Sequence, residues 1–245
     1  GCHGFFAFLG YNLSPMTKIL SLDTSNEACS AAILDGSVCL HAFEVCPRKQ
    51  SSRILPMIDA LLKQASLTLT CLDAIAVSQG PGSFTGVRLG LSVAQGLAFG
   101  ANRPVVPIST LKALAFQAKK RHSAPVDAIV VAMDARMDEV YYALFDAKSL
   151  EPIGEEQVVK PADIAPLPEA LYAQKIIACG NGFELYQNLL LSRFEINFEA
   201  VYSEVVPEAQ SIAHLAEKAF LSNQALHALE AKPVYIRNQV VQSAV

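Results

Sequence analysis

The sequence has few charged residues and no excess of basic ones. Only 17% of its 245 residues are charged, and the formal net charge is −4. A protein that holds RNA by itself usually carries a basic stripe, because phosphate contacts supply most of its affinity. One short basic run stands out at residues 119–122, and it fits either the solvated end of a helix or a contact with RNA.

Long apolar runs are also missing. No run of about 18 or more apolar residues occurs, so we expect no membrane-spanning helix. The first fifteen residues are apolar and aromatic, but they lack the basic start and the cleavage site of a signal peptide. Met16 directly precedes a strong strand pattern, so we expect residues 1–15 to be a poorly ordered extension and Met16 to be the functional start.

Cysteine and histidine are present without the spacing of a metal site. The cysteines are Cys2, Cys29, Cys39, Cys46, Cys71 and Cys179, and none forms a CxxC pair. Several lie inside apolar runs, as buried free thiols do, so we expect a reducing, cytoplasmic compartment. No two histidines are three or four residues apart, which excludes an HxxxH pair. We therefore predict no metal ligand, and His41, within a predicted strand, is expected to be structural.

Apolar residues are abundant instead, and their spacing predicts the first half of the fold. The chain is 52% hydrophobic with a mean hydropathy of +0.31, which indicates a large core and some apolar surface facing a partner. Asp35-Gly36 is a hairpin signal. The predicted strands are residues 19–22, 29–34, 38–45, 74–78 and 105–108, and the predicted helices are residues 52–65, 84–99 and 111–119.

The pattern then restarts. A strand at residues 128–133 ends at Asp134, as the first strand ends at Asp23, and the repeated layout indicates an internal duplication. Further strands are predicted at residues 140–145, 156–159 and 175–178, with a short segment around Ala162 and a final helix at 209–221. Two consecutive α/β lobes with mixed sheets flanked by helices are similar to the ASKHA superfamily (actin-like ATPase, ribonuclease H-like).

That resemblance sets the expected domains. The first lobe is expected at residues 16–110 and the second at 111–207, with a tail at 223–245. The helix at about residues 208–222 is expected to pack back on the first lobe and complete it, as the resemblance implies.

The loops that would hold a nucleotide lack a feature of this fold. Actin-like ATPases place phosphates on two DxG hairpins, whose glycine lets backbone N–H groups come close. Here the two sites read Asp23-Thr24-Ser25 and Asp134-Ala135-Arg136, without that glycine. The two aspartates could still hold a hydrated Mg²⁺ ion.

The turn Gly80-Pro81-Gly82-Ser83 at the start of a predicted helix has two interpretations. Its N–H groups could bind an anion, as free amides at a helix start do. Alternatively, the glycines make a tight strand-to-helix turn and Ser83 caps the helix. A serine hydrolase is not indicated, because residues 82–86 do not read GxSxG.

The most specific block of the sequence is SQGPGSFTGVRLG at residues 78–90. Further blocks occur at residues 23–25, 46–48 with 53–56, 109–111, 134–141 and 233–237. In this order, from Met16 to about Asn238, they closely resemble the TsaB (YeaZ) family, in the glycoprotease-like branch of the ASKHA superfamily. Gln50 departs from the family, many of whose members carry a histidine before this helix.

The resemblance implies a non-catalytic subunit for the threonylcarbamoyl modification of N6 of the adenosine next to the anticodon in tRNA. It implies a catalytic, metal-bearing paralogue, TsaD, and a small ATPase, TsaE, as partners, with tRNA reached through the complex and no membrane partner. It implies no cofactor for this chain alone, although ATP, ADP or Mg²⁺ could bind at an interface of the complex. Two alternatives stay open: a stand-alone nucleotide-binding ATPase and a metallopeptidase of the same fold.

The helix predicted over residues 84–99 indicates where a partner binds. Arg88 is its one charged residue, and a helix that is apolar all round must be covered on every side. Two glycine pairs with a spacing of four, Gly86/Gly90 and Gly96/Gly100, allow close approach of another backbone, from this chain or from a partner.

The family joins its paralogue through helices of the first lobe, so the resemblance implies a contact surface on residues 52–65 and 85–99. The expected exposed contacts are Arg53, Met57, Leu61, Arg88, Leu91 and Gln95. A charge at Leu91 is expected to break the complex and leave the fold intact. Without the partner, the same surface could form a two-fold homodimer.

Overall fold

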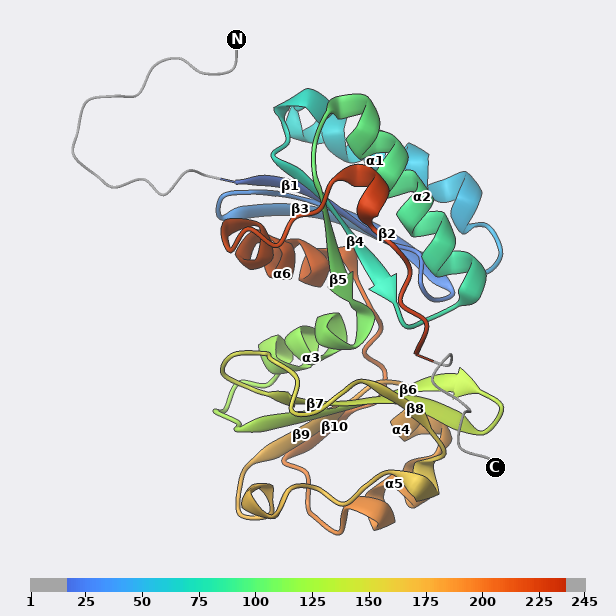
Figure 1. The fold of residues 1–245 in the computed structure, drawn as a ribbon, viewed down its shortest axis with the longest axis vertical. Helices are drawn as coiled ribbons and strands as arrows, with labels where there is room; N and C mark the ends of the chain where they lie inside the picture. The colour runs from blue at the N-terminus through green and yellow to red at the C-terminus, as the bar shows by residue number, and fades with distance from the viewer. Residues whose placement is uncertain (1–16, 237–245) are drawn as a thin grey trace, which may run out of the picture.

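Two α/β lobes stand one above the other in the computed structural model, which describes residues 17–236 (Figure 1). The expected extension at residues 1–15, the start at Met16 and residues 237–245 of the expected tail lie outside the described range. Each lobe is built on one five-stranded mixed sheet, and helices or short turns cover both faces of each sheet. The α/β class with two mixed sheets that the sequence predicts is therefore confirmed.

The first sheet has the strand order β3-β2-β1-β4-β5. Its strands are β1 (Lys18–Asp23), β2 (Ala28–Asp35), β3 (Val38–Val45), β4 (Ala74–Gly80) and β5 (Val105–Ser109). β1 pairs antiparallel with β2 and parallel with β4. The β2–β3 hairpin turns at Gly36 and Ser37, one residue beyond the predicted pair, because Asp35 still pairs with Val38.

The second sheet repeats this topology, with the order β10-β9-β6-β7-β8. Its strands are β6 (Ala128–Arg136), β7 (Glu139–Asp146), β8 (Gln157–Val159), β9 (Ile176–Cys179) and β10 (Ala200–Tyr202). β6 pairs antiparallel with β7 and parallel with β9, as β1 does with β2 and β4. The two lobes therefore share one strand order and one set of pairings, as expected of a duplication.

Helices form three layers around the two sheets (Figure 1). The outer face of the first sheet carries α1 (Gln50–Ala65) and α2 (Phe84–Ala101), and the outer face of the second carries α4 (Gly182–Leu185) and α5 (Gln187–Phe194). Between the sheets lie α3 (Thr110–Arg121), capped by Ser109 as predicted, and α6 (Ala209–Leu221). No helix within residues 17–236 has the length and hydrophobicity to cross a membrane.

The last helix packs on the first lobe. The hydroxyl of Ser21 in β1 donates to the carbonyl oxygen of Ala209 at 2.6 Å, and the Ala209 N–H donates to Ser30 Oγ in β2 at 2.9 Å. α3 leaves the first sheet after β5 and packs on β6, β7 and β9 of the second. The two helices therefore cross between the lobes and tie them together.

The second lobe is less helical than the first. In place of α1 it has only short 3-10 turns, Pro161–Asp163 and Glu169–Leu171. The sequence did not predict α4, α5 or β10. α4 has four residues and β10 has three, which is too short to show a period, and the eight residues of α5 show only a weak one.

The core runs without a break from one lobe to the other. Ile19 of β1, Ile129 of β6 and Ile212 of α6 belong to one buried cluster between the sheets. The next residues along these strands, Leu20 and Val130, face the opposite sides and join the outer clusters. Because both faces of each central strand are covered, the strands appear in the sequence as unbroken apolar runs.

Candidate functional site

The carboxylate of Asp23, at the end of β1, is bonded by its own neighbours. It accepts hydrogen bonds from the Ser78 hydroxyl, from Asn26 Nδ2 at 3.0 Å and from the Ser25 N–H at 3.3 Å. The residue is only 1% exposed, and this burial raises the pKa of the carboxyl to about 6. Protein donors, rather than open space, therefore surround the oxygens that were considered for a hydrated ion.

Helix α2 begins directly against the same loop. The Ser83 N–H donates to the Ser25 carbonyl oxygen at 2.8 Å, and Ser83 Oγ accepts from the Gly86 N–H at 3.4 Å. A Cβ added to Gly86 would lie 2.0 Å from Thr24 O, and one added to Gly82 would lie 2.7 Å from Ser25 O. The turn therefore packs its backbone closely against the backbone of Thr24 and Ser25, and Ser83 caps the helix.

The start of this turn also needs glycine. Gly80 has a φ of +103° and is followed by a cis peptide bond to Pro81. Gly180, which follows β9 in the second lobe, has a φ of +99°, so the turns after the two equivalent strands adopt similar backbone conformations.

Asp134 holds the matching position in the second lobe. Its backbone N–H donates to the Asn181 side chain at 2.9 Å, and its carboxylate accepts from the Arg136 N–H at 2.9 Å. The Arg136 guanidinium lies 3.3 Å from the second carboxylate oxygen. Within residues 17–236, no group of three or more His, Cys, Asp or Glu side chains is placed to hold a metal ion.

The residues predicted as partner contacts do not share one exposed face. Leu61 and Leu91 are each 3% exposed and belong to the core under α1 and α2, so the prediction that they are exposed was wrong. On α2 the buried face contains Val87, Leu91, Ala94 and Ala98, and periodicity could not identify it because the helix is apolar all round. Arg53 is exposed and pairs with Glu44 at 2.7 Å, and Met57 is half-buried.

Arg88 and Gln95 bind the chain's own C-terminal segment. The Arg88 guanidinium carbon lies 3.5 Å from the centroid of the Phe84 ring, and its Nε donates to the Tyr235 hydroxyl at 2.5 Å. Gln95 Nε2 donates to the Ala231 carbonyl oxygen at 3.0 Å. Residues 231–235 therefore run along α2, and the Val234 N–H reaches Gln79 O at 2.8 Å, beside the glycine turn.

The outward side of α2 forms a stripe that the sequence predicted only in part, since Arg88 and the Gly96/Gly100 pair were expected contacts and Ser92 and Phe99 were not. We define the α2 stripe as Arg88, Ser92, Gly96, Phe99 and Gly100, all of which are exposed. A Cβ added to Gly96 or Gly100 would meet no atom of the described residues within 4 Å, whereas Gly86 and Gly90 pack tightly against Thr24. Counting in fours from Arg88, the only charged residue of the helix, finds Ser92, Gly96 and Gly100, and Phe99 shares their side because it lies three residues after Gly96.

The duplicated lobes, with α3 and α6 crossing between them, place the chain in the ASKHA class of α/β proteins. A family model described as tRNA N6-adenosine threonylcarbamoyltransferase (TsaD) matches residues 44–243.

Close relatives agree in sequence and in structure. The chain is 39% identical to "tRNA threonylcarbamoyladenosine biosynthesis protein TsaB" of Haemophilus influenzae over 91% of this chain and 94% of that protein. It is 37% identical to the protein of the same name from Escherichia coli, over 91% of this chain and 96% of that one. The solved structure of YeaZ from Pseudomonas aeruginosa superposes with a TM-score of 0.81 at 36% identity, covering 90% of this chain and 100% of that one. The chain belongs to the TsaB (YeaZ) family.

Proposed function

We propose that this chain is a non-catalytic subunit of the system that forms threonylcarbamoyladenosine in tRNA, acting as scaffold and activator of the catalytic paralogue TsaD. Membership of a family whose characterised relatives are named for this biosynthesis supports the pathway. The internal bonding of the two aspartate loops supports the non-catalytic role, since both carboxylates are already bound by residues of their own lobes.

The observation that carries the scaffold role is the α2 stripe. Phe99 is 67% exposed, and the neighbouring helix α1 presents Leu55 at 49% exposure. Gly96 and Gly100 leave open space beside Phe99, where a helix of another protein can approach closely. A large exposed aromatic next to a flat strip of small residues is the kind of anchor that dominates protein interfaces.

In this proposal, TsaD packs across α1 and α2, with Arg53 and Met57 at the edge of the contact and the α2 stripe at its centre. TsaE joins the assembled complex, and tRNA is reached through it. ATP, ADP or Mg²⁺ would bind at an interface of the complex rather than in this chain alone. Without TsaD, the same surface pairs with a second copy of the chain.

The test of the proposed function is a reconstituted reaction. TsaD, TsaE, threonylcarbamoyl-adenylate and tRNA are combined with and without this chain, and modified adenosine is measured. We expect modification only when the chain is present, and no modification by the chain alone. If the chain alone modifies tRNA, or hydrolyses ATP or peptides at a useful rate, the proposal is wrong and one of the catalytic alternatives holds.

A matched pair of variants locates the contact. Burying one phenylalanine side chain is worth about 1.5–3 kcal/mol, so Phe99→Ser is expected to weaken the association with TsaD by about tenfold or more. Leu185→Ser is the control, because Leu185 is 57% exposed on the outer face of the second lobe. Equal affinities of the two variants for TsaD would place the contact elsewhere.

A further inference from the structure

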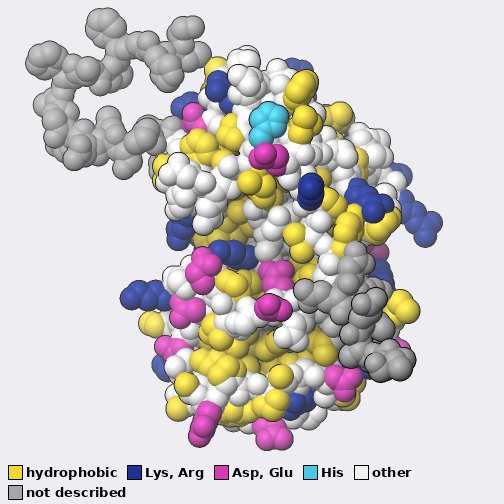
Figure 2. Space-filling view, viewed as in Figure 1, with side chains coloured by type: hydrophobic (Ala, Val, Ile, Leu, Met, Phe, Trp, Pro, Cys, Tyr) yellow, Lys and Arg dark blue, Asp and Glu magenta, His cyan; other side chains and the backbone are white. Residues whose placement is uncertain are grey.

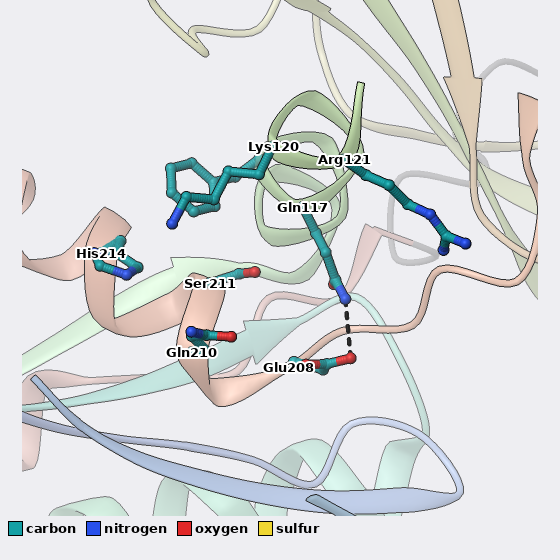
Figure 3. A pocket seen from close by; sticks show the side chains of 8 residues that line it. Gln117, Lys120, Arg121, Glu208, Gln210, Ser211 and His214 are labelled. Atoms are coloured by element: carbon teal, nitrogen blue, oxygen red, sulfur yellow. Dashed lines mark hydrogen bonds between the residues drawn. The ribbon is translucent and has the colours of Figure 1, made fainter. Parts of the chain in front are cut away.

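A cavity of about 250 Å³ lies between α3 and α6, and none of the aspartate-loop, glycine-turn or α2-stripe residues lines it. Figure 3 shows Lys120 and His214 on one side, Arg121 on another, and Gln117 reaching toward Glu208. Both basic and acidic side chains gather in the hollow between the lobes in Figure 2. The cavity thus offers positive charge and hydrogen-bond acceptors within one small space.

Lys120 supplies the available positive charge. In the part of the chain that the structure describes, no carboxylate forms an ion pair with Lys120, whose Nζ lies 5.4 Å from the centroid of the Phe116 ring. Arg121 is paired with Glu204 at 2.8 Å. Burial, and then the charge of Lys120, lower the pKa of His214, while Glu217 acts in the opposite direction. An anion placed between Lys120 and His214 would therefore meet a cation that no carboxylate neutralises.

The side chain of Gln117 supplies a hydrogen-bond acceptor. Its Nε2 donates to Glu208 Oε1 at 2.9 Å. Since a carboxylate only accepts, this bond fixes the orientation of the amide and leaves Gln117 Oε1 buried, with no hydrogen-bond partner among residues 17–236. Buried polar atoms are almost always paired, so this oxygen indicates a ligand that brings an N–H or O–H donor.

Two aromatic rings, those of Phe116 and His214, also line the cavity. The rings of Phe116 and His214 lie with their centroids 5.9 Å apart. Pockets for drug-sized ligands measure about 300–1,000 Å³, so a cavity of about 250 Å³ limits the ligand to a small molecule no larger than a single nucleotide unit.

We propose that this cavity binds a single nucleotide unit, with its phosphate at Lys120 and its hydrogen-bond donors at Gln117 Oε1 and Glu208. The nucleotide comes either as a free mononucleotide or as one unit of an RNA strand, because the recognising chemistry is the same. The basic run at residues 119–122 then has a binding role at Lys120 as well as its place at the end of α3. This site is separate from the α2 stripe and does not depend on the scaffold role.

The test measures binding of AMP, adenosine and inorganic phosphate to the whole chain by calorimetry. We expect AMP to bind, and adenosine to bind about tenfold more weakly or worse, because it lacks the charge-assisted contact with Lys120. Lys120→Gln is expected to weaken AMP binding by the same factor. Lys119→Gln removes the same charge one residue away, where Lys119 Nζ lies 3.5 Å from the Lys148 carbonyl oxygen and outside the cavity, and should change affinity less than about twofold.

A competition with tRNA distinguishes the two sources. If tRNA displaces AMP and binds more weakly to the Lys120→Gln variant, the nucleotide belongs to RNA; if AMP binds without competition from tRNA, the ligand is a free nucleotide.

The proposal is overturned if neither AMP nor tRNA binds, or if the Lys119 and Lys120 variants lose affinity equally. Lys120 is exposed, so the variant is expected to fold, which its thermal unfolding checks. The reconstituted modification assay is read separately, so either proposal can fail alone.

Discussion

Two glycine-to-alanine changes on the same helix should have opposite effects on stability. In Gly86→Ala the new methyl group would lie 2.0 Å from Thr24 O, so the start of α2 must move away from the Asp23 loop. In Gly96→Ala the methyl group meets no atom within 4 Å in the part of the chain that the structure describes. The substitution is the same, and only the surroundings of the added carbon differ.

The expected magnitudes follow from these distances. Alanine is favoured over glycine in a helix interior by about 1 kcal/mol, so Gly96→Ala should raise the free energy of unfolding by up to that amount. Overpacking of a tight site costs about 1–3 kcal/mol. The hydrogen bond from Thr24 Oγ1 to Gly86 O, 2.7 Å long, contributes about 1 kcal/mol more if it is lost. Gly86→Ala should therefore lower the free energy of unfolding by about 2 kcal/mol, after its own gain in helix propensity is subtracted.

Thermal and urea unfolding of both variants and the unaltered chain provide the measurement. A change of 1 kcal/mol shifts the melting temperature of a chain of this size by about 2–4 °C, so the two variants should differ by about 6–12 °C. If Gly86→Ala is as stable as the unaltered chain, α2 is not seated on the Asp23 loop and the account of the glycine turn fails. Gly96→Ala also adds bulk to the α2 stripe, so it should weaken the association with TsaD while the fold gains stability.

Two further changes test the core and the buried carboxylate. Leu91→Glu places a charge at a position that is 3% exposed, so it should unfold the chain rather than selectively break a complex. Circular dichroism and protease sensitivity measure the unfolding. A folded variant would contradict the burial of this face of α2. The pKa of Asp23 is about 6 in the folded chain and 3.8 ordinarily, so the fold favours the protonated carboxyl. The resulting stabilisation is full below about pH 4 and is lost as the pH rises through 6. The free energy of unfolding should fall by up to about 3 kcal/mol over this range. Asp23→Asn should therefore show a smaller decrease of unfolding free energy between pH 5 and pH 7 than the unaltered chain, and equal slopes would contradict the raised pKa.

The local sequence was sufficient for most of the first lobe. The strand ending at Asp23, the hairpin after Asp35 and the helix caps at Ser83 and Ser109 depend on residues close together in the chain, and the structure has them where the sequence predicts, within a residue. The second lobe was harder because its outer layer is made of short turns and of α4 and α5, whose period is weak.

The sequence by itself determined the strand and helix order of the first lobe, the duplication and the glycine turn, because backbone propensity and hydrophobic period act over a few residues. Only the tertiary structure decided which side of α2 faces the core, since the sequence of a helix that is apolar all round does not show which side is buried. It also joined Arg88 to Tyr235, 147 residues away, and Gln117 to Glu208, 91 residues away. Contacts at such separations are fixed by how the layers pack.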